Sequence, residues 1–98
     1  MLPENGGHAG LETRRRRIIY RAWHRGTREL DLLLGRFADA QVSRMDAAAL
    51  DRFETLMNLP EPTLMAVLTG AADVPDGIDA ALVSRIAAFH AENPVAKA

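Results

Sequence analysis

Apolar side chains recur every three or four residues in five segments of this chain, and short polar or proline-containing stretches separate the segments. A spacing of three and four residues places side chains on one face of an α-helix, whereas a half-buried strand needs strict alternation. The sequence contains no convincing stretch of such alternation. With 98 residues it has room for one domain and one modest core. We therefore expect an all-α protein, a compact antiparallel bundle of about five short helices.

Residues that start and stop helices give approximate bounds for these segments. Asp46 and Asp79 are typical N-caps, and each is preceded by an apolar residue that can pack against the next turn. The expected helices cover residues 12–24, 28–40, a third from Asp46, a fourth between Pro60 and Gly70, and a fifth from Asp79 to about residue 92. Residues 1–11 are expected to be a disordered tail, residues 12–92 the single helical domain, and residues 93–98 a C-terminal tail.

The net charge of −1 hides an uneven distribution along the chain. Residues 1–36 hold eight arginines against four acids, and residues 37–98 hold four basic residues against nine acids. Such a distribution orients an approaching charged partner. The sequence has no cysteine, no apolar run of membrane-spanning length and no secretory signal pattern at its start. We expect a bacterial cytoplasmic protein.

A charged junction separates the first two expected helices, with the sequence Arg25-Gly26-Thr27-Arg28-Glu29-Leu30-Asp31. Gly26 can adopt a positive φ, so we expect it to end the first helix as its C′ residue. Thr27 can cap the next helix, and Glu29 and Asp31 fall in the first turn, where the helix dipole favours negative charge. From the residues alone, two interpretations stay open: a structural ion pair between Arg25 and Glu29, and a contact point for a partner.

The junction also resembles the signature of a known family. Arg25-Gly26-x-x-Glu29, continued as Leu30-Asp31-x-x-Leu34-x-x-Phe37, is similar to the motif of the SdhE family of succinate dehydrogenase flavinylation factors, which has a mitochondrial assembly-factor counterpart. A second similar block is Phe53-Glu54-x-Leu56-Met57-x-x-x-Glu61-Pro62-x-Leu64-x-x-x-Leu68. The resemblance covers about residues 14–70. The chain departs from the family at Val67, where many relatives carry tryptophan, and at Glu61, where they carry aspartate.

This resemblance implies a function. SdhE-like proteins bind the flavoprotein subunit of succinate dehydrogenase, and in some bacteria that of fumarate reductase, and promote covalent attachment of FAD to a histidine of that subunit. It implies an assembly factor that is not itself an enzyme, binds no cofactor stably and acts on the FAD of its partner. We expect it to be a monomer when free. The expected partner-binding residues are Arg25, Gly26 and Glu29, supported by Arg28 and Asp31, with Arg21 and His24 from the preceding helix.

Two other classes of function remain as alternatives. The run Arg14-Arg15-Arg16-Arg17, with Arg21 and Trp23, resembles a nucleic-acid-binding patch, although the pI is near 6.3. A generic helical adaptor would instead use an exposed apolar stripe. Catalytic and metal sites lack their parts: there is no phosphate-binding glycine loop or cysteine nucleophile, and the three histidines do not share ligand spacing. We therefore expect no catalytic residue and no metal site.

Overall fold

The computed structural model of the protein describes residues 10–94. Within this range the chain forms five α-helices and one short 3-10 helix, with no β-strand, which confirms the expected all-α fold. The elements are α1 (Leu11–Ala22), α2 (Arg28–Gln41), η2 (Val42–Arg44), α3 (Ala47–Met57), α4 (Glu61–Thr69) and α5 (Ala80–Glu92). The expected tails fall mostly on residues 1–9 and 95–98, outside the described residues, whereas Leu11 is already helical.

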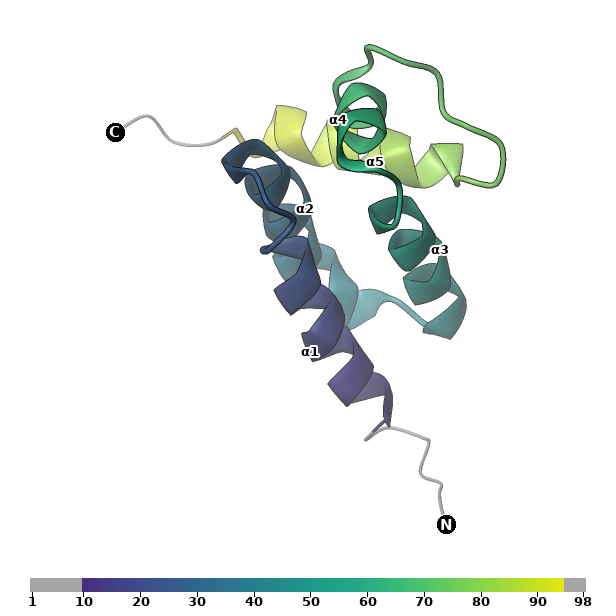
Figure 1. Cartoon of the computed structure of the whole chain (residues 1–98). Helices are drawn as coiled ribbons and strands as arrows, with labels where there is room; N and C mark the ends of the chain where they lie inside the picture. The colour runs from purple at the N-terminus through teal and green to yellow at the C-terminus, as the bar shows by residue number, and fades with distance from the viewer. Residues whose placement is uncertain (1–9, 95–98) are drawn as a thin grey trace.

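The helices form a bundle in which α2 packs between α1 and α5, and α1 also contacts α3. α1 and α2 lie side by side and run in opposite directions, α3 runs back along them, and α5 lies across one end with α4 next to it (Figure 1). The junction between α1 and α2 therefore lies at one end of the bundle. No helix in residues 10–94 combines the length and apolar character that a membrane crossing requires.

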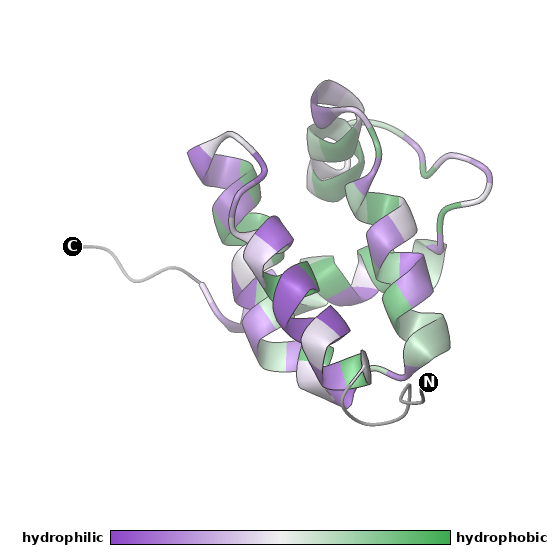
Figure 2. Cartoon of the chain, turned by 60° about the horizontal axis from the view of Figure 1, so that its bottom comes forward, coloured by the Kyte–Doolittle hydropathy of each residue, from purple (hydrophilic) through white to green (hydrophobic). Residues whose placement is uncertain are grey.

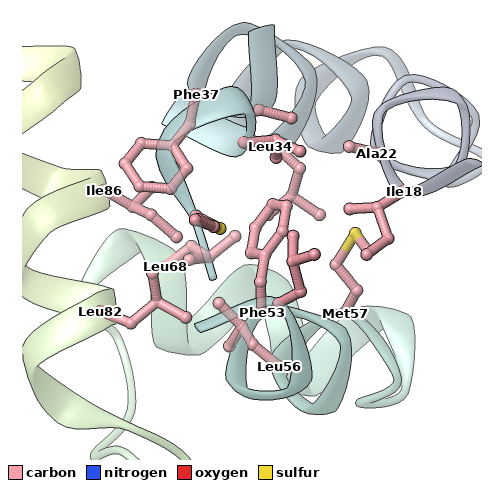
Figure 3. Close-up of a cluster of buried hydrophobic side chains, with 14 of the residues drawn as sticks. Ile18, Ala22, Leu34, Phe37, Phe53, Leu56, Met57, Leu68, Leu82 and Ile86 are labelled. Carbon is pink, nitrogen blue, oxygen red and sulfur yellow. The ribbon is translucent and has the colours of Figure 1, made fainter. Parts of the chain in front are cut away.

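One apolar core holds the helices together, and its centre is aromatic (Figure 3). The Phe37 ring of α2 packs against Phe53 of α3, with ring centroids 5.8 Å apart, and edge-on against Phe89 of α5 at 5.7 Å. No polar or charged residue of the described chain is fully buried. The buried residues are Ile18, Ala22, Leu30, Leu34, Phe37, Ala38, Val42, Met45, Leu50, Phe53, Leu56, Met57, Leu64, Val67, Leu68, Leu82 and Ile86. Val67, in α4, is one of these buried residues.

The helix starts follow the expected capping residues. Thr27 Oγ1 accepts a hydrogen bond from the Leu30 N–H at 3.3 Å, and Asp46 accepts one from the Ala49 N–H at 2.8 Å. Asp79 Oδ1 accepts from the N–H groups of Ala81 at 2.9 Å and Leu82 at 3.3 Å. These bonds satisfy N–H groups that have no partner inside the helix.

Replacing Asp79 with alanine should lower the free energy of unfolding by about 1 kcal/mol, because α5 loses its cap. Urea denaturation followed by circular dichroism measures this loss. Asp76→Ala is the matched control, since Asp76 is an exposed aspartate in the same loop with no side-chain hydrogen bond or ion pair to the described residues. Equal loss in both variants would contradict the capping role.

Two local features differ from expectation. α1 ends at Ala22, not at His24, so Gly26 is not its C′ residue, although Gly26 does adopt a positive φ of 117°. The helix stops early because Trp23, the residue after Ala22, leaves the helix so that its side chain packs onto Gly35 and bonds Asp39 of α2. A 3-10 turn, Val42–Arg44, also extends α2 and had no signal in the sequence.

Candidate partner-binding site

The corner between α1 and α2 is fixed by hydrogen bonds to its own backbone. Asp31 Oδ1 accepts a bond of 2.7 Å from the Arg25 N–H, and the Asp31 N–H donates to the Thr27 carbonyl at 2.9 Å. Thr27 also caps α2. Gly26 adopts its positive φ between these anchors. Asp31 therefore holds the corner in shape from the inside, which is a supporting role.

The Arg25 side chain turns away from Glu29. Its Nη2 lies 3.5 Å from the Leu59 carbonyl in the connection between α3 and α4, at the limit of a hydrogen bond. No ion pair joins Arg25 to Glu29 within the described residues. The interpretation of these two residues as a structural ion pair is therefore wrong. Arg25 thereby links the corner to the start of α4.

Glu61 lies directly beneath the corner. A Cβ at Gly26 would stand 3.4 Å from Glu61 Oε2. That oxygen and Arg25 Nε are both buried without a hydrogen-bond partner among the described residues. Buried polar atoms are nearly always paired, so two unpaired atoms of opposite charge beside one glycine are unusual. A Cβ at Gly26 would touch this carboxylate at ordinary contact distance, and the positive φ of 117° is what disfavours a side chain there.

Arg28 and Glu29 point into solvent from the first turn of α2. Both are exposed, and neither makes a side-chain hydrogen bond or ion pair with the described part of the chain. Arg28 stands at the positive end of the helix dipole, which disfavours a cation. These two charges thus contribute little to the fold and are available to a partner.

An open hollow of about 510 Å³ lies against this corner. Four of the seven expected site residues line it: His24, Gly26, Arg28 and Asp31. The others that line it are Trp23, Thr27 and Leu32. The structure therefore brings most of the expected set together around one surface depression.

An exposed pair of rings, Tyr20 and His24, adjoins the hollow. From the sequence, only His24 of this pair was expected at the site. Tyr20 is 63% exposed, the only large apolar side chain so exposed within residues 10–94. Its ring stacks on His24, with centroids 4.0 Å apart, and His24 Nδ1 lies 2.7 Å from the Tyr20 carbonyl, to which it donates. Aromatic rings of this kind are common anchors in protein interfaces. Within residues 10–94, His24 is not part of any group of metal-binding side chains.

Arg21, also expected at the site, lies on another side of α1. Its guanidinium donates to Asn58 at 2.8 Å and pairs with Glu54 at 3.4 Å, both from the end of α3. These contacts give Arg21 a structural role in joining α1 to α3. Its role in partner binding stays a prediction.

The arginine run at the start of α1 is also partly occupied within the fold. Arg14 pairs with Asp51 and Glu54 of α3, and Arg15 donates to the Met45 carbonyl at 2.6 Å. Hydrogen bonds to Glu54 and then Asp51 raise the pKa of Arg14 above its ordinary value. Figure 2 shows hydrophilic residues along much of α1. Only Arg16 and Arg17 of this run are exposed, which weakens the nucleic-acid alternative.

A close contact between Trp23 and Gly35 was missed by the sequence analysis. The indole Nε1 donates to Asp39 at 3.1 Å, and its ring lies over Gly35 of α2, where an added Cβ would come within 2.2 Å of the ring. A glycine inside a helical pattern was the available signal, because it marks a close approach. This contact fixes the start of the loop of residues 23–27 against the side of α2.

Comparison with known proteins identifies the family. The family model described as flavinator of succinate dehydrogenase matches residues 16–90. FAD assembly factor SdhE of Acetobacter pasteurianus is 41% identical over 66 residues, which cover 67% of this chain and 61% of that protein. The mitochondrial succinate dehydrogenase assembly factor 2 of Dictyostelium discoideum is 26% identical over 83 residues, covering 85% of this chain and 58% of that protein.

The chain thus spans about three fifths of these two relatives. A third relative, the mitochondrial succinate dehydrogenase assembly factor 2 of Arabidopsis thaliana, is 34% identical over 62 residues, 63% of this chain and 33% of that protein. No solved structure matches the chain. The match of the family model runs from within α1 into α5 and includes the whole corner. The chain therefore belongs to the SdhE family, the flavinators of succinate dehydrogenase.

Proposed function

We propose that this chain binds the flavoprotein subunit of succinate dehydrogenase and promotes covalent attachment of FAD to a histidine of that subunit. It acts as a chaperone in the bacterial cytoplasm, and the groups that carry out the chemistry belong to the partner. The flavoprotein subunit of fumarate reductase is a further client of the same kind. Family membership supports the process, and the corner supports the place of contact.

The observation that carries the proposal is the pair of free charges, Arg28 and Glu29, on a rigid corner. Solvent-exposed charges that stabilise nothing in the fold can form charge-assisted hydrogen bonds when a partner covers them. Gly26 allows the partner's backbone to approach closely, because no side chain projects there. Tyr20 and His24 add apolar area beside the charges, so the surface has both an anchor and orienting groups.

Attachment of the flavin joins an imidazole nitrogen to the 8α carbon of the isoalloxazine ring: a C–H bond of the 8α-methyl group and the imidazole N–H bond break, and the ring itself takes up the two electrons and two protons as reduced flavin. Such a step is fast only when the two reacting atoms are held close and aligned. By binding next to the acceptor histidine, the corner orders the partner segment that carries it. Glu29 and Arg28 orient this segment, and Gly26 and Asp31 keep the corner in shape. The chain thus contributes positioning and no catalytic residue.

The flavin itself stays with the partner in this proposal. The exposed charged side chains at the corner that lack a partner among the described residues are one cation, Arg28, and one anion, Glu29. A site for the two phosphates of FAD needs several donors or cations aimed at one place. One charge of each sign suits a protein surface better.

Covalent flavin on the partner tests the proposal. The flavoprotein subunit is expressed with the wild-type chain, with Glu29→Ala, or with neither, and in-gel fluorescence after denaturation reports the attached flavin. The wild-type chain should raise the signal. Glu29→Ala should weaken binding about tenfold to a hundredfold and return the signal close to background when the chain is limiting.

Glu12→Ala is the control, because Glu12 is also an exposed glutamate in the first turn of a helix, and its ion pair with Arg15 at 3.4 Å lies at the surface. It should leave the flavin signal at the wild-type level. Equal signal with and without the chain would refute the function. A rise that Glu29→Ala leaves intact would keep the function and remove Glu29 from the contact.

A further inference from the structure

The basic residues of the acid-rich half of the chain gather at one place, far from the corner. Residues 37–98 hold nine acids and four basic residues, and three of these four are Arg44, Arg52 and Arg85, the fourth being Lys97, outside the described residues. All three arginines line a single hollow of about 270 Å³. They come from η2, α3 and α5, so the fold and not the local sequence brings them together.

Two of these arginines make no polar contact with the rest of the described chain. Arg44 and Arg85 are exposed and make no side-chain hydrogen bond or ion pair with the described residues. Arg52 pairs through Nε with Asp79 at 3.2 Å. Asp46 is the one acid among the described residues that line this hollow, and Asp79 compensates Arg52, so Arg44 and Arg85 leave the hollow with a net positive charge that attracts an anion.

A second hollow of about 210 Å³ continues the first. Both are lined by Phe37, Gln41 and Arg85, and the second adds Ala88, Phe89 and Glu92 of α5. The combined surface is called here the arginine groove: Arg44 and Arg52 line its first hollow, Phe89 lines its second, and Arg85 lines both. Because cationic and apolar side chains share one open surface made of two adjoining hollows, it suits a peptide segment better than a compact ion.

We propose that the arginine groove binds an acidic, extended segment of the client flavoprotein. A carboxylate of the segment pairs with Arg44 and Arg85, and a neighbouring apolar side chain lies against Phe89, which is only partly buried. This inference rests on the proposed function. Polypeptide fits better than nucleic acid, because Asp46 and Glu92 line the groove together with the arginines and Phe89, an arrangement that suits single carboxylates spaced by apolar side chains and not a continuous phosphate backbone.

The groove would be a second contact, separate from the corner. Gln41, which lines the groove, is the last residue of α2, and Arg28 at the corner is the first. A rise of 1.5 Å per residue puts them about 20 Å apart. Two contacts at this spacing fix the orientation of the factor on its client, and together they bind more tightly than either alone.

The test is the affinity of the purified chain for the purified flavoprotein subunit of succinate dehydrogenase. Arg44→Glu/Arg85→Glu should weaken binding about tenfold or more and flatten its dependence on salt. The matched control is Arg16→Glu/Arg17→Glu, which makes the same change of charge at exposed arginines of α1 without described partners. The control should change affinity less than about threefold, the range of ordinary surface substitutions. Unchanged helical circular dichroism verifies folding.

The outcomes separate this inference from the proposed function. If the wild-type chain does not bind the flavoprotein, both fail. If it binds and both double variants bind equally well, the groove is not a contact and the proposed function stands. If phosphate alone or an oligonucleotide binds the wild type and loses binding in Arg44→Glu/Arg85→Glu while client affinity is unchanged, the occupant is different and the inference is wrong.

A photo-crosslinking residue in place of Gln41 locates the contact directly. Irradiation of the purified complex should join it to a client segment that contains aspartate or glutamate. Attachment to a segment without acidic residues, or no attachment in a complex that forms with wild-type affinity, would overturn the proposed occupant.

Discussion

Gly26→Arg should abolish covalent flavin attachment to the client while the helical fold is retained. The glycine has a φ of 117°, which side-chain-bearing residues rarely adopt, so the substitution costs about 1–3 kcal/mol of strain. Any Cβ here also meets the buried Glu61 carboxylate at 3.4 Å. The long side chain then fills the space at the corner that a partner backbone needs. In-gel flavin fluorescence measures the loss, and circular dichroism checks the fold.

Gly77→Arg separates lost binding from lost stability. Gly77 also has a positive φ, 86°, and no atom lies within 4 Å of the position that a Cβ would take. Its loop, between α4 and α5, is distant from the corner (Figure 1). The two variants add the same charge and comparable strain, yet only Gly26→Arg should lose flavin attachment. Equal loss in both would show that strain alone is responsible.

Gly35→Ala should destabilise the protein by about 1–3 kcal/mol, although alanine is the better helix former. A Cβ at this position would stand 2.2 Å from Cδ2 and 2.5 Å from Cε2 of Trp23, far inside contact distance. The ring must leave α2 and lose its bond to Asp39. Trp23 is the only tryptophan, so its fluorescence should shift to longer wavelength as the ring enters water. Urea denaturation measures the stability.

The sign of this effect should reverse without the tryptophan. In a Trp23→Ala background, Gly35→Ala meets no ring and should stabilise the protein by up to about 1 kcal/mol through helix propensity. A double-mutant cycle over the two positions measures the coupling. The same destabilisation in both backgrounds would mean that the clash lies with another group.

The sequence predicted the features that depend on neighbours along the chain. Thr27, Asp46 and Asp79 cap the helices that they precede, because a capping side chain bonds only two or three residues ahead. The apolar stripes likewise form the core, since their spacing is a property of each helix. The corner was located correctly for the same reason, and Gly26 does have a positive φ.

The contacts that the sequence analysis missed join residues far apart in the chain. Arg14 is 37 residues from Asp51, and Arg25 is 34 residues from Leu59. The sequence offered Arg14 and Arg21 for a nucleic-acid-binding patch, whereas packing of α1 against α3 gives both of them acidic partners. The end of α1 was misplaced because the contact of Trp23 with Gly35 is also tertiary. Local patterns carry no information about such pairings.

At the corner, the residues that hold its shape are different from the residues that we propose to meet a partner. Gly26, Thr27 and Asp31 build it through backbone contacts, whereas Arg28 and Glu29 face water and contact nothing in the described chain. Surface substitutions of the second kind change unfolding free energy by only about 0.5 kcal/mol. If the proposed contact holds, client preference can therefore change at positions 28 and 29 at a small cost in folding, which at Glu29 includes its favourable place in the first turn of α2. An engineered library at these two positions offers a route to flavinylation factors for new clients.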